Sequence, residues 1–268
     1  MKTNFGKGLL AFSEGDYKQA FSFFEKAHRE NIPSDKHLTL YNTGLSLIFL
    51  GDLALAEDYF LKALRNFPDH ADTLHWIAYI NFRKGQLSIA EDHYLSSLKS
   101  HLRSQTSING CIHFFIEQGL NGEEIKSFLN KNGVQLKANE NFYFKLADPV
   151  NVSIDSNIIF SLIGIDPRST MQTSIKSYGC YEPLMVEKIL KHVGKTDIVY
   201  DIGAHIGYYS CIFNGVTESK KVVSLEPDFY SSNLINRNTN ERGIVVNKFI
   251  GSELGHNTTT LNDLSSML

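Results

Sequence analysis

Cysteine is scarce in this sequence, and the few cysteines lie far apart. The 268 residues include three, at Cys111, Cys180 and Cys211, and no two of them have C-x-x-C spacing. An odd number of widely separated cysteines argues against a disulfide framework and against a zinc site, so we expect no metal. Free thiols fit a reducing compartment, and we expect the protein to be cytoplasmic.

Long hydrophobic runs and an excess of one charge are also missing. The N-terminal apolar patch, Leu9 to Phe12, is too short for a signal-peptide core, and no run approaches the ~18 apolar residues of a membrane span. Charges nearly balance, with 26 Lys and Arg against 29 Asp and Glu, so the basic surface typical of nucleic-acid binding is absent. Hydrophobic residues make up 42% of the chain, enough for one or two globular domains.

The first half of the sequence repeats itself with small and aromatic residues at fixed places. The first copy has Gly8, Gly15, Ala20, Phe24 and Ala27; the second has Gly44, Gly51, Ala56, Phe60 and Ala63; a looser third has Ala78, Gly85, Ala90 and Tyr94. A period near 34 residues is typical of helix–turn–helix repeats. We predict that the second glycine of each copy forms the turn and that the aromatic residue fills the space between repeats.

These residues resemble the tetratricopeptide repeat family over roughly 1–102, with a degenerate fourth unit or a capping helix pair at about 107–129. The resemblance implies an α-solenoid over 1–130 whose concave face binds a protein or peptide partner; a scaffold alone is the alternative. Family members that bind C-terminal carboxylates use Lys, Arg and Asn on the first helices. Asn4, Lys7, Asn42 and Asn81 suggest such a site only loosely, because exposed polar residues on helices are usually just solvated.

Residues 131–149 break the helical period and are predicted to connect two domains. Asn132-Gly133 and Asp148-Pro149 mark turns. Two β-rich runs follow, 150–154 and 158–163, and predict a hairpin.

From Glu182 onward, helix and strand patterns alternate. We expect helices at about 182–193, 206–214 and 228–241, and strands at 197–202, 221–226 and 244–250. Such alternation predicts a parallel sheet covered on both faces, with a ligand at the carboxyl ends of the strands.

Two carboxylates follow neighbouring predicted strands. Asp201 ends the first within the segment VYDIGAHIGYYS, and Glu226 ends the second, before Pro227. A ribose needs a carboxylate after the second strand to accept its hydroxyl hydrogens, and a positively charged amino-acid end favours acidic oxygens near the first turn. S-adenosyl-L-methionine has both features. A nicotinamide or flavin dinucleotide would require G-x-G-x-x-G, but His205 and Tyr208 occupy two of those glycine positions.

The segments VYDIGAHIGYYS, VVSLEP and TTTLNDL resemble the FkbM-type methyltransferase family, as does the upstream YGCYEP at 178–183. The resemblance covers about 150–268 and implies a partial Rossmann-like class I methyltransferase sheet that O-methylates hydroxyl groups of sugars or other small molecules. His205 departs from the asparagine that the family usually has there. Both side chains tolerate positive φ, so cofactor binding is expected to survive.

The predicted cofactor-binding residues lie in the two turns: Asp201, Gly203, Ala204, His205, Gly207, Glu226, Pro227 and Asp228. Asp201 is assigned to the methionine end of the cofactor, with a helix-capping interaction as the alternative. Glu226 is assigned to the ribose hydroxyls. The two glycines are expected to keep the pocket wall open, and plain turn geometry is compatible with that. Asp228 is equally well explained as a helix cap, and His205 as a turn histidine.

Other residues have weaker assignments. Ser252 and Glu253 are placed near the adenine. No catalytic base is assigned; Tyr181, Glu182 and His205 are candidates by position, and Glu182 is also explained as a helix-terminal acid.

The sheet half has fewer strands than a complete methyltransferase, because the segment expected after TTTLNDL is missing. The strand at 197–202 should then form an exposed apolar edge, and we predict a fragment or a protein completed by another chain. The alternative is an interaction adaptor with a vestigial methyltransferase portion.

Overall fold

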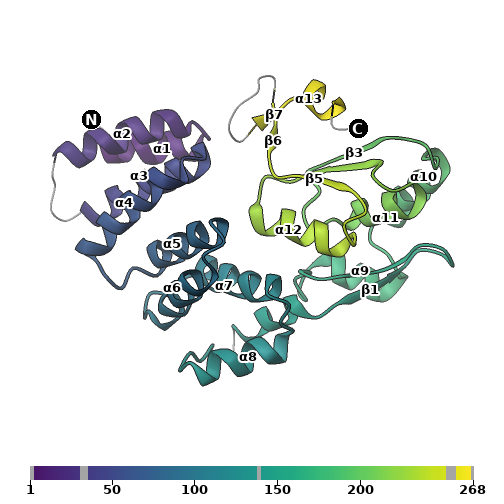
Figure 1. Ribbon diagram of the computed structural model, residues 1–268, viewed down its shortest axis with the longest axis horizontal. Coiled ribbons are helices and arrows are strands. Elements are labelled where there is room, and N and C mark those ends of the chain that lie inside the picture. The colour runs from purple at the N-terminus through teal and green to yellow at the C-terminus, as the bar shows by residue number, and fades with distance from the viewer. Residues whose placement is uncertain (1–2, 31–35, 138–139, 252–257, 267–268) are drawn as a thin grey trace. The chain divides into compact units, whose positions relative to one another are not determined.

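The computed structural model describes residues 3–30, 36–137, 140–251 and 258–266. Two compact units are present (Figure 1): residues 1–111 with 131–134, and residues 112–130 with 135–268. Within the described residues, no helix has both the length and the apolar character needed to cross a membrane.

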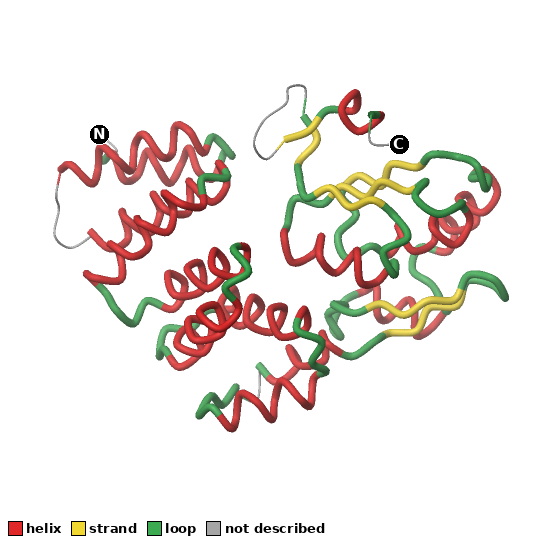
Figure 2. Tube along the Cα trace, in the orientation of Figure 1, coloured by secondary structure: helices red, strands yellow, loops and turns green. Residues whose placement is uncertain are grey.

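The first unit is built from helical hairpins (Figures 1 and 2). Its helices are α1 (Asn4–Ser13), α2 (Tyr17–Glu30), α3 (Lys36–Leu50), α4 (Leu53–Asn66), α5 (Ala71–Arg83) and α6 (Leu87–Lys99). They are followed by α7 (Gln105–Glu117) and α8 (Gly122–Lys131). The predicted helical-repeat region is confirmed, and α4 ends two residues before Pro68, which cannot continue a helix.

The turns inside the hairpins share one backbone conformation. Gly15, Gly51 and Gly85 have φ of 79°, 82° and 74°, a region that costs glycine little. Gly119, between α7 and α8, has φ of 89° and lies 34 residues after Gly85 (119 − 85). The α7–α8 pair therefore repeats the hairpin geometry, although residues 112–130 pack with the second unit.

Close packing in the first unit depends on glycine opposite an aromatic ring. A Cβ on Gly8 would lie 2.5 Å from the ring of Phe24, and one on Gly44 would lie 2.8 Å from the ring of Phe60. Phe24, Phe60 and Tyr94 are fully buried, as predicted. Any larger residue at these glycines must displace a buried ring.

The second unit begins with elements that only partly match the prediction. The hairpin is confirmed, with β1 (Val150–Ser153) antiparallel to β2 (Ile159–Leu162). The predicted connector at 131–149 contains a 3-10 helix, η2 (Asn141–Ala147), which buries Tyr143 and Leu146. Helix α9 (Thr170–Tyr178) was not predicted, although its Ser169 cap and the αL Gly179 after it are ordinary end signals.

The central sheet has three parallel strands in the order β3 (Val199–Ile202), β4 (Val222–Leu225) and β5 (Ile244–Val246). The alternating helices are α10 (Pro183–His192), α11 (Tyr208–Val216) and α12 (Phe229–Asn238). Every residue of β4 is buried, because Ser224 faces Ser210 of α11 while Val223 and Leu225 on the other face pack with Leu264. Helices α11 and α12 cover one face of the sheet (Figure 1). The predicted β/α alternation and parallel pairing are confirmed, whereas α11 and α12 lie on the same face and so do not confirm the predicted helices on both faces.

The strand predicted at 244–250 is split into β5 and β6 (Phe249–Ile250). The side chain of Asn247 donates to the carbonyl oxygens of Glu226 (2.9 Å) and Pro227 (2.8 Å), which breaks the extended run. β6 pairs in parallel with β7 (Thr258–Thr259). Helix α13 (Leu261–Ser265) follows, and its Leu264 packs on Val223, Leu225 and Val246.

β3 lies at an edge of the three-stranded sheet within the described part of the chain. Its neighbour Ile198 is 48% exposed, and Ile202 is 55% exposed. The predicted apolar edge at this strand is therefore present in the described sheet.

Candidate functional site

The candidate site is formed by two loops at the carboxyl ends of β3 and β4. Ile202 pairs with Leu225 in the last register position of the two strands. The carbonyl oxygen of Leu225 accepts hydrogen bonds from the N–H groups of Gly203 (2.9 Å) and Ala204 (3.0 Å). These bonds hold the β3–α11 loop directly against the end of β4.

Glu226 is an acidic group at this edge that is held by two backbone N–H groups. One carboxylate oxygen accepts the N–H of His205 at 2.9 Å, and the other accepts the N–H of Asp228 at 2.8 Å. The residue is only 8% exposed. A carboxylate oxygen accepts about two hydrogen bonds, so both oxygens retain capacity for a donor from a ligand.

Asp201 lies close to Glu226 but is turned toward the interior. Ser210 Oγ donates to Asp201 Oδ2 at 2.6 Å, and Ser224 Oγ lies 2.7 Å from Ser210 Oγ. Burial raises the pKa of Asp201, the hydrogen bonds from Ser210 oppose that shift, and the negative charge of Glu226 adds to it. The two predicted carboxylates are thus close enough to interact, as their adjacent strands require.

In the bend between β3 and α11, three residues with positive φ alternate with two buried residues. Gly203, His205 and Gly207 have φ of 76°, 52° and 86°, while Ala204 is buried. A Cβ on Gly203 would meet nothing within 4 Å, so this position is open. A Cβ on Gly207 would lie 3.2 Å from Ile235. Gly207 therefore packs against α12, and its role in opening the pocket stays a prediction.

The remaining predicted residues have mixed outcomes. Asp228 caps α12 by accepting the N–H of Ser231 at 2.8 Å, in agreement with its structural alternative. Pro227 is half-buried, and its carbonyl accepts from Asn247. Ser252 and Glu253 lie outside the described residues.

The candidate bases Tyr181 and Glu182 lie just before α10, within a network of tyrosines. Tyr208 Oη accepts the N–H of Tyr181 (2.7 Å) and donates to its carbonyl (2.8 Å). Tyr209 donates to Glu182. Glu182 has φ of 48° and is the N-cap residue of α10, without a side-chain cap bond, so its carboxylate lies at the helix N-terminus as the structural alternative expects.

Sequence analysis missed two residues at this edge. Asn247 ties the β4–α12 loop to the end of β5, as described above. His113 of α7 stacks its ring on Tyr230, with centroids 5.4 Å apart and planes at 25°. Burial lowers the pKa of His113 to about 4; the charge of His205 adds to this shift and that of Asp228 opposes it. A histidine among the apolar residues of α7 was the available signal.

Two further interactions hold the end of α7 against α12 within the second unit. The guanidinium of Arg237 donates to the carbonyl of Ile116. Burial raises the pKa of Glu117, and the nearby charge of Arg237 opposes that shift. These interactions hold the end of α7, and the stack on Tyr230 orients the ring of His113.

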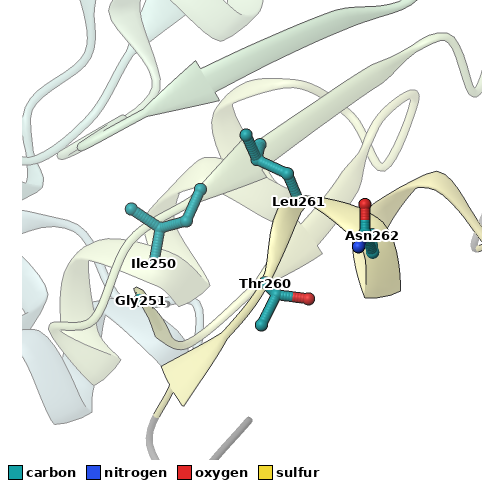
Figure 3. Close-up of a pocket in the computed structure, with 5 residues that line it drawn as sticks. All are labelled: Ile250, Gly251, Thr260, Leu261 and Asn262. Carbon is teal, nitrogen blue, oxygen red and sulfur yellow. The ribbon is translucent and has the colours of Figure 1, made fainter. Parts of the chain in front are cut away.

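A separate open pocket of about 390 Å³ lies beside β6 and the start of α13. Ile250, Gly251, Thr260, Leu261 and Asn262 line it (Figure 3). Thr260 is engaged in a capping box with Asp263. Among the residues that the structure describes, none of the predicted site residues lines this pocket.

The tetratricopeptide positions proposed for a carboxylate ligand make contacts of their own. The side-chain amides of Asn42 and Asn81 donate to the carbonyls of Leu38 and Ile77, each at 2.8 Å. Asn4 donates to Glu30 at 2.5 Å, and Lys7 lies over the ring of Phe23. These four residues do not single out a ligand.

Comparison with known proteins adds one firm assignment. The family model described as tetratricopeptide repeat matches residues 39–70. No curated protein matches the chain. A solved structure of a point mutant of the Thermobaculum terrenum O-GlcNAc transferase is similar, with 12% identity and a TM-score of 0.42.

That similarity covers 91% of this chain and 41% of the transferase, so the chain spans less than half its length. A likeness this distant carries neither fold nor activity to this chain. The family match does not extend to residues 150–268, where the methyltransferase resemblance stays a prediction. The chain contains a tetratricopeptide repeat at 39–70, and such repeats point to protein interaction.

Proposed function

We propose that the second unit binds S-adenosyl-L-methionine and that the protein is a methyltransferase of the FkbM type, acting on a hydroxyl group of a sugar or other small molecule. The observation that supports this most directly is the carboxylate of Glu226. It follows β4, two backbone N–H groups hold it, and Asp201 of β3 lies near enough for the two charges to interact.

The geometry suits a ribose. The two hydroxyl groups of a ribose donate to a single carboxylate, and Glu226 keeps an acceptor position on each oxygen. Because backbone groups fix the carboxylate, little side-chain entropy is lost when a ligand binds. The open position at Gly203 leaves room beside the first turn.

The two carboxylates also suit the charge of the cofactor. A sulfonium group and an ammonium group are both positive, and Glu226 places a carboxylate at this edge, with the Asp201 carboxyl behind it on Ser210. The bound cofactor would supply an electrophilic methyl group. The residues of this chain would bind and orient it, since methyl transfer depends largely on positioning.

The repeats of the first unit would bind a protein partner that recruits the enzyme or presents its acceptor. An adaptor without methyltransferase activity is the second candidate, favoured by the tetratricopeptide match at 39–70. A dinucleotide enzyme is a weaker candidate, because His205 and Tyr208 stand where its glycines belong.

Calorimetric titration with S-adenosylhomocysteine separates these candidates. The wild type should bind, and Glu226→Gln should weaken binding about 10- to 100-fold, because a charge-assisted hydrogen bond to the ribose contributes about 1.5–3 kcal/mol. Glu218→Gln is the matched control, since it removes the same charge from an exposed residue before β4. A folded wild type that does not bind, or equal affinities for both variants, would favour the adaptor.

A further inference from the structure

His113 comes from a part of the sequence distant from the two loops of the candidate site. It belongs to α7, and its neighbours in the second unit are Tyr230, which it stacks on, and the charged groups of Asp228 and His205. The N–H groups of Asp228 and His205 are the two that hold the Glu226 carboxylate. His113 therefore lies beside the loops that present that carboxylate.

The imidazole of His113 has an unused hydrogen-bonding capacity. Its Nδ1 is buried and has no hydrogen-bond partner within the described part of the chain. A buried N–H without a partner is rarer and less tolerated than a buried lone pair. The neutral ring is therefore expected to carry its proton on Nε2, on the opposite edge of the partly exposed residue.

We propose that His113 is a ligand-contacting residue of the nucleoside site, with its Nε2–H donating to a ribose hydroxyl whose own hydrogen is donated to Glu226. A hydroxyl is both acceptor and donor, so it suits a position between an imidazole N–H and a carboxylate. The stack on Tyr230 and the bond from Arg237 to Ile116 fix the ring before the ligand arrives. The helix α7 thereby supplies a specificity residue to the site.

This inference rests on the proposed function, and two variants test it. His113→Phe keeps a ring that can stack on Tyr230 but has no nitrogen, whereas His113→Gln keeps an N–H donor near the position of Nε2. We expect His113→Phe to weaken binding of S-adenosylhomocysteine about 3- to 10-fold with the melting temperature little changed. His113→Gln should recover part of that loss.

Deoxy analogues of the ligand identify the contact. The 2′-deoxy and 3′-deoxy forms of S-adenosylhomocysteine should each bind the wild type more weakly, and one of them should bind His113→Phe and the wild type equally well. That coupling is the signature of a hydrogen bond between His113 and one hydroxyl. A purely structural role would weaken all three ligands by the same factor.

The outcomes separate the two proposals. If the wild type binds S-adenosylhomocysteine and folded His113→Phe binds all three ligands as the wild type does, the inference is overturned and the proposed function stands. If the wild type binds no ligand, both fall. If His113→Phe does not fold, ¹⁵N NMR of the wild-type imidazoles tests the inference instead. The signals of His113 are assigned by their loss in His113→Gln. If they do not change at saturating ligand, the inference is overturned.

Discussion

The two units differ in how their important residues are distributed along the chain. In the first unit, each hairpin turns at a glycine with positive φ. In two of the repeats a second glycine packs against an aromatic ring. In the second unit, the candidate site joins loops after two strands to a histidine 113 residues upstream of Glu226 (226 − 113). A periodic structure can be predicted from a sequence, whereas a site built from segments far apart in the sequence can be predicted only in part.

The largest effect should follow from breaking the repeats. Phe60→Ala removes a fully buried ring that packs on Gly44, and we expect a loss of about 3–5 kcal/mol in the free energy of unfolding. Urea unfolding followed by circular dichroism measures it. Phe249→Ala, at a residue 45% exposed, is the control and should cost far less. Similar losses for the two variants would mean that Phe60 is not a core residue.

A smaller effect should separate the two glycines of the candidate site. Gly207→Ala combines positive φ with a contact at 3.2 Å to Ile235, whereas Gly203→Ala meets no atom. We expect Gly207→Ala to cost roughly 1–3 kcal/mol, and Gly203→Ala to cost less because it carries the backbone strain alone. Thermal unfolding of both variants tests this order. The reverse order would contradict the packing assigned to Gly207.

The smallest effect at neutral pH should come from two histidines, one in each unit: His75, which is buried, and His113, which is half-buried. Burial lowers the pKa of His75 to about 3 and that of His113 to about 4, from an ordinary value of 6.5. A lowered pKa means that the unfolded chain binds more protons, so stability falls as pH drops from 6.5 through these values. We expect no change near pH 7 and progressive destabilisation toward pH 4.

Proton NMR titration of the two imidazoles tests that expectation. Both rings should remain neutral at pH 5 while the protein stays folded. His113→Phe should reduce the loss of stability between pH 6.5 and pH 4, because the proton uptake on unfolding is removed. An imidazole of His75 or His113 that titrates near 6.5 in the folded protein would contradict its burial.

Much of the fold could be predicted because its signals are local and repeated. The 34-residue spacing located the hairpins, and the alternation after Glu182 located the strands of a parallel sheet. Helix η2 and helix α9 were missed because each is short and has no marked apolar period. The strand at 244–250 was predicted as one piece because the side-chain bonds of Asn247 to a neighbouring loop are tertiary contacts.

The candidate site divides in the same way. Asp201 and Glu226 were found from the sequence because they end adjacent strands, and the structure places them close together. The packing of Gly207 on Ile235 and the approach of His113 could not be found, since both depend on how helices dock on the sheet. Local patterns thus predicted where the carboxylates lie but not what surrounds them.

The central claim is that a nucleoside binds at the carboxyl ends of β3 and β4. A crystal structure of the protein with S-adenosylhomocysteine tests this most directly. We predict both ribose hydroxyls within hydrogen-bond distance of the Glu226 carboxylate. A ligand bound elsewhere, with Glu226 touching only the N–H groups of His205 and Asp228, would contradict the account.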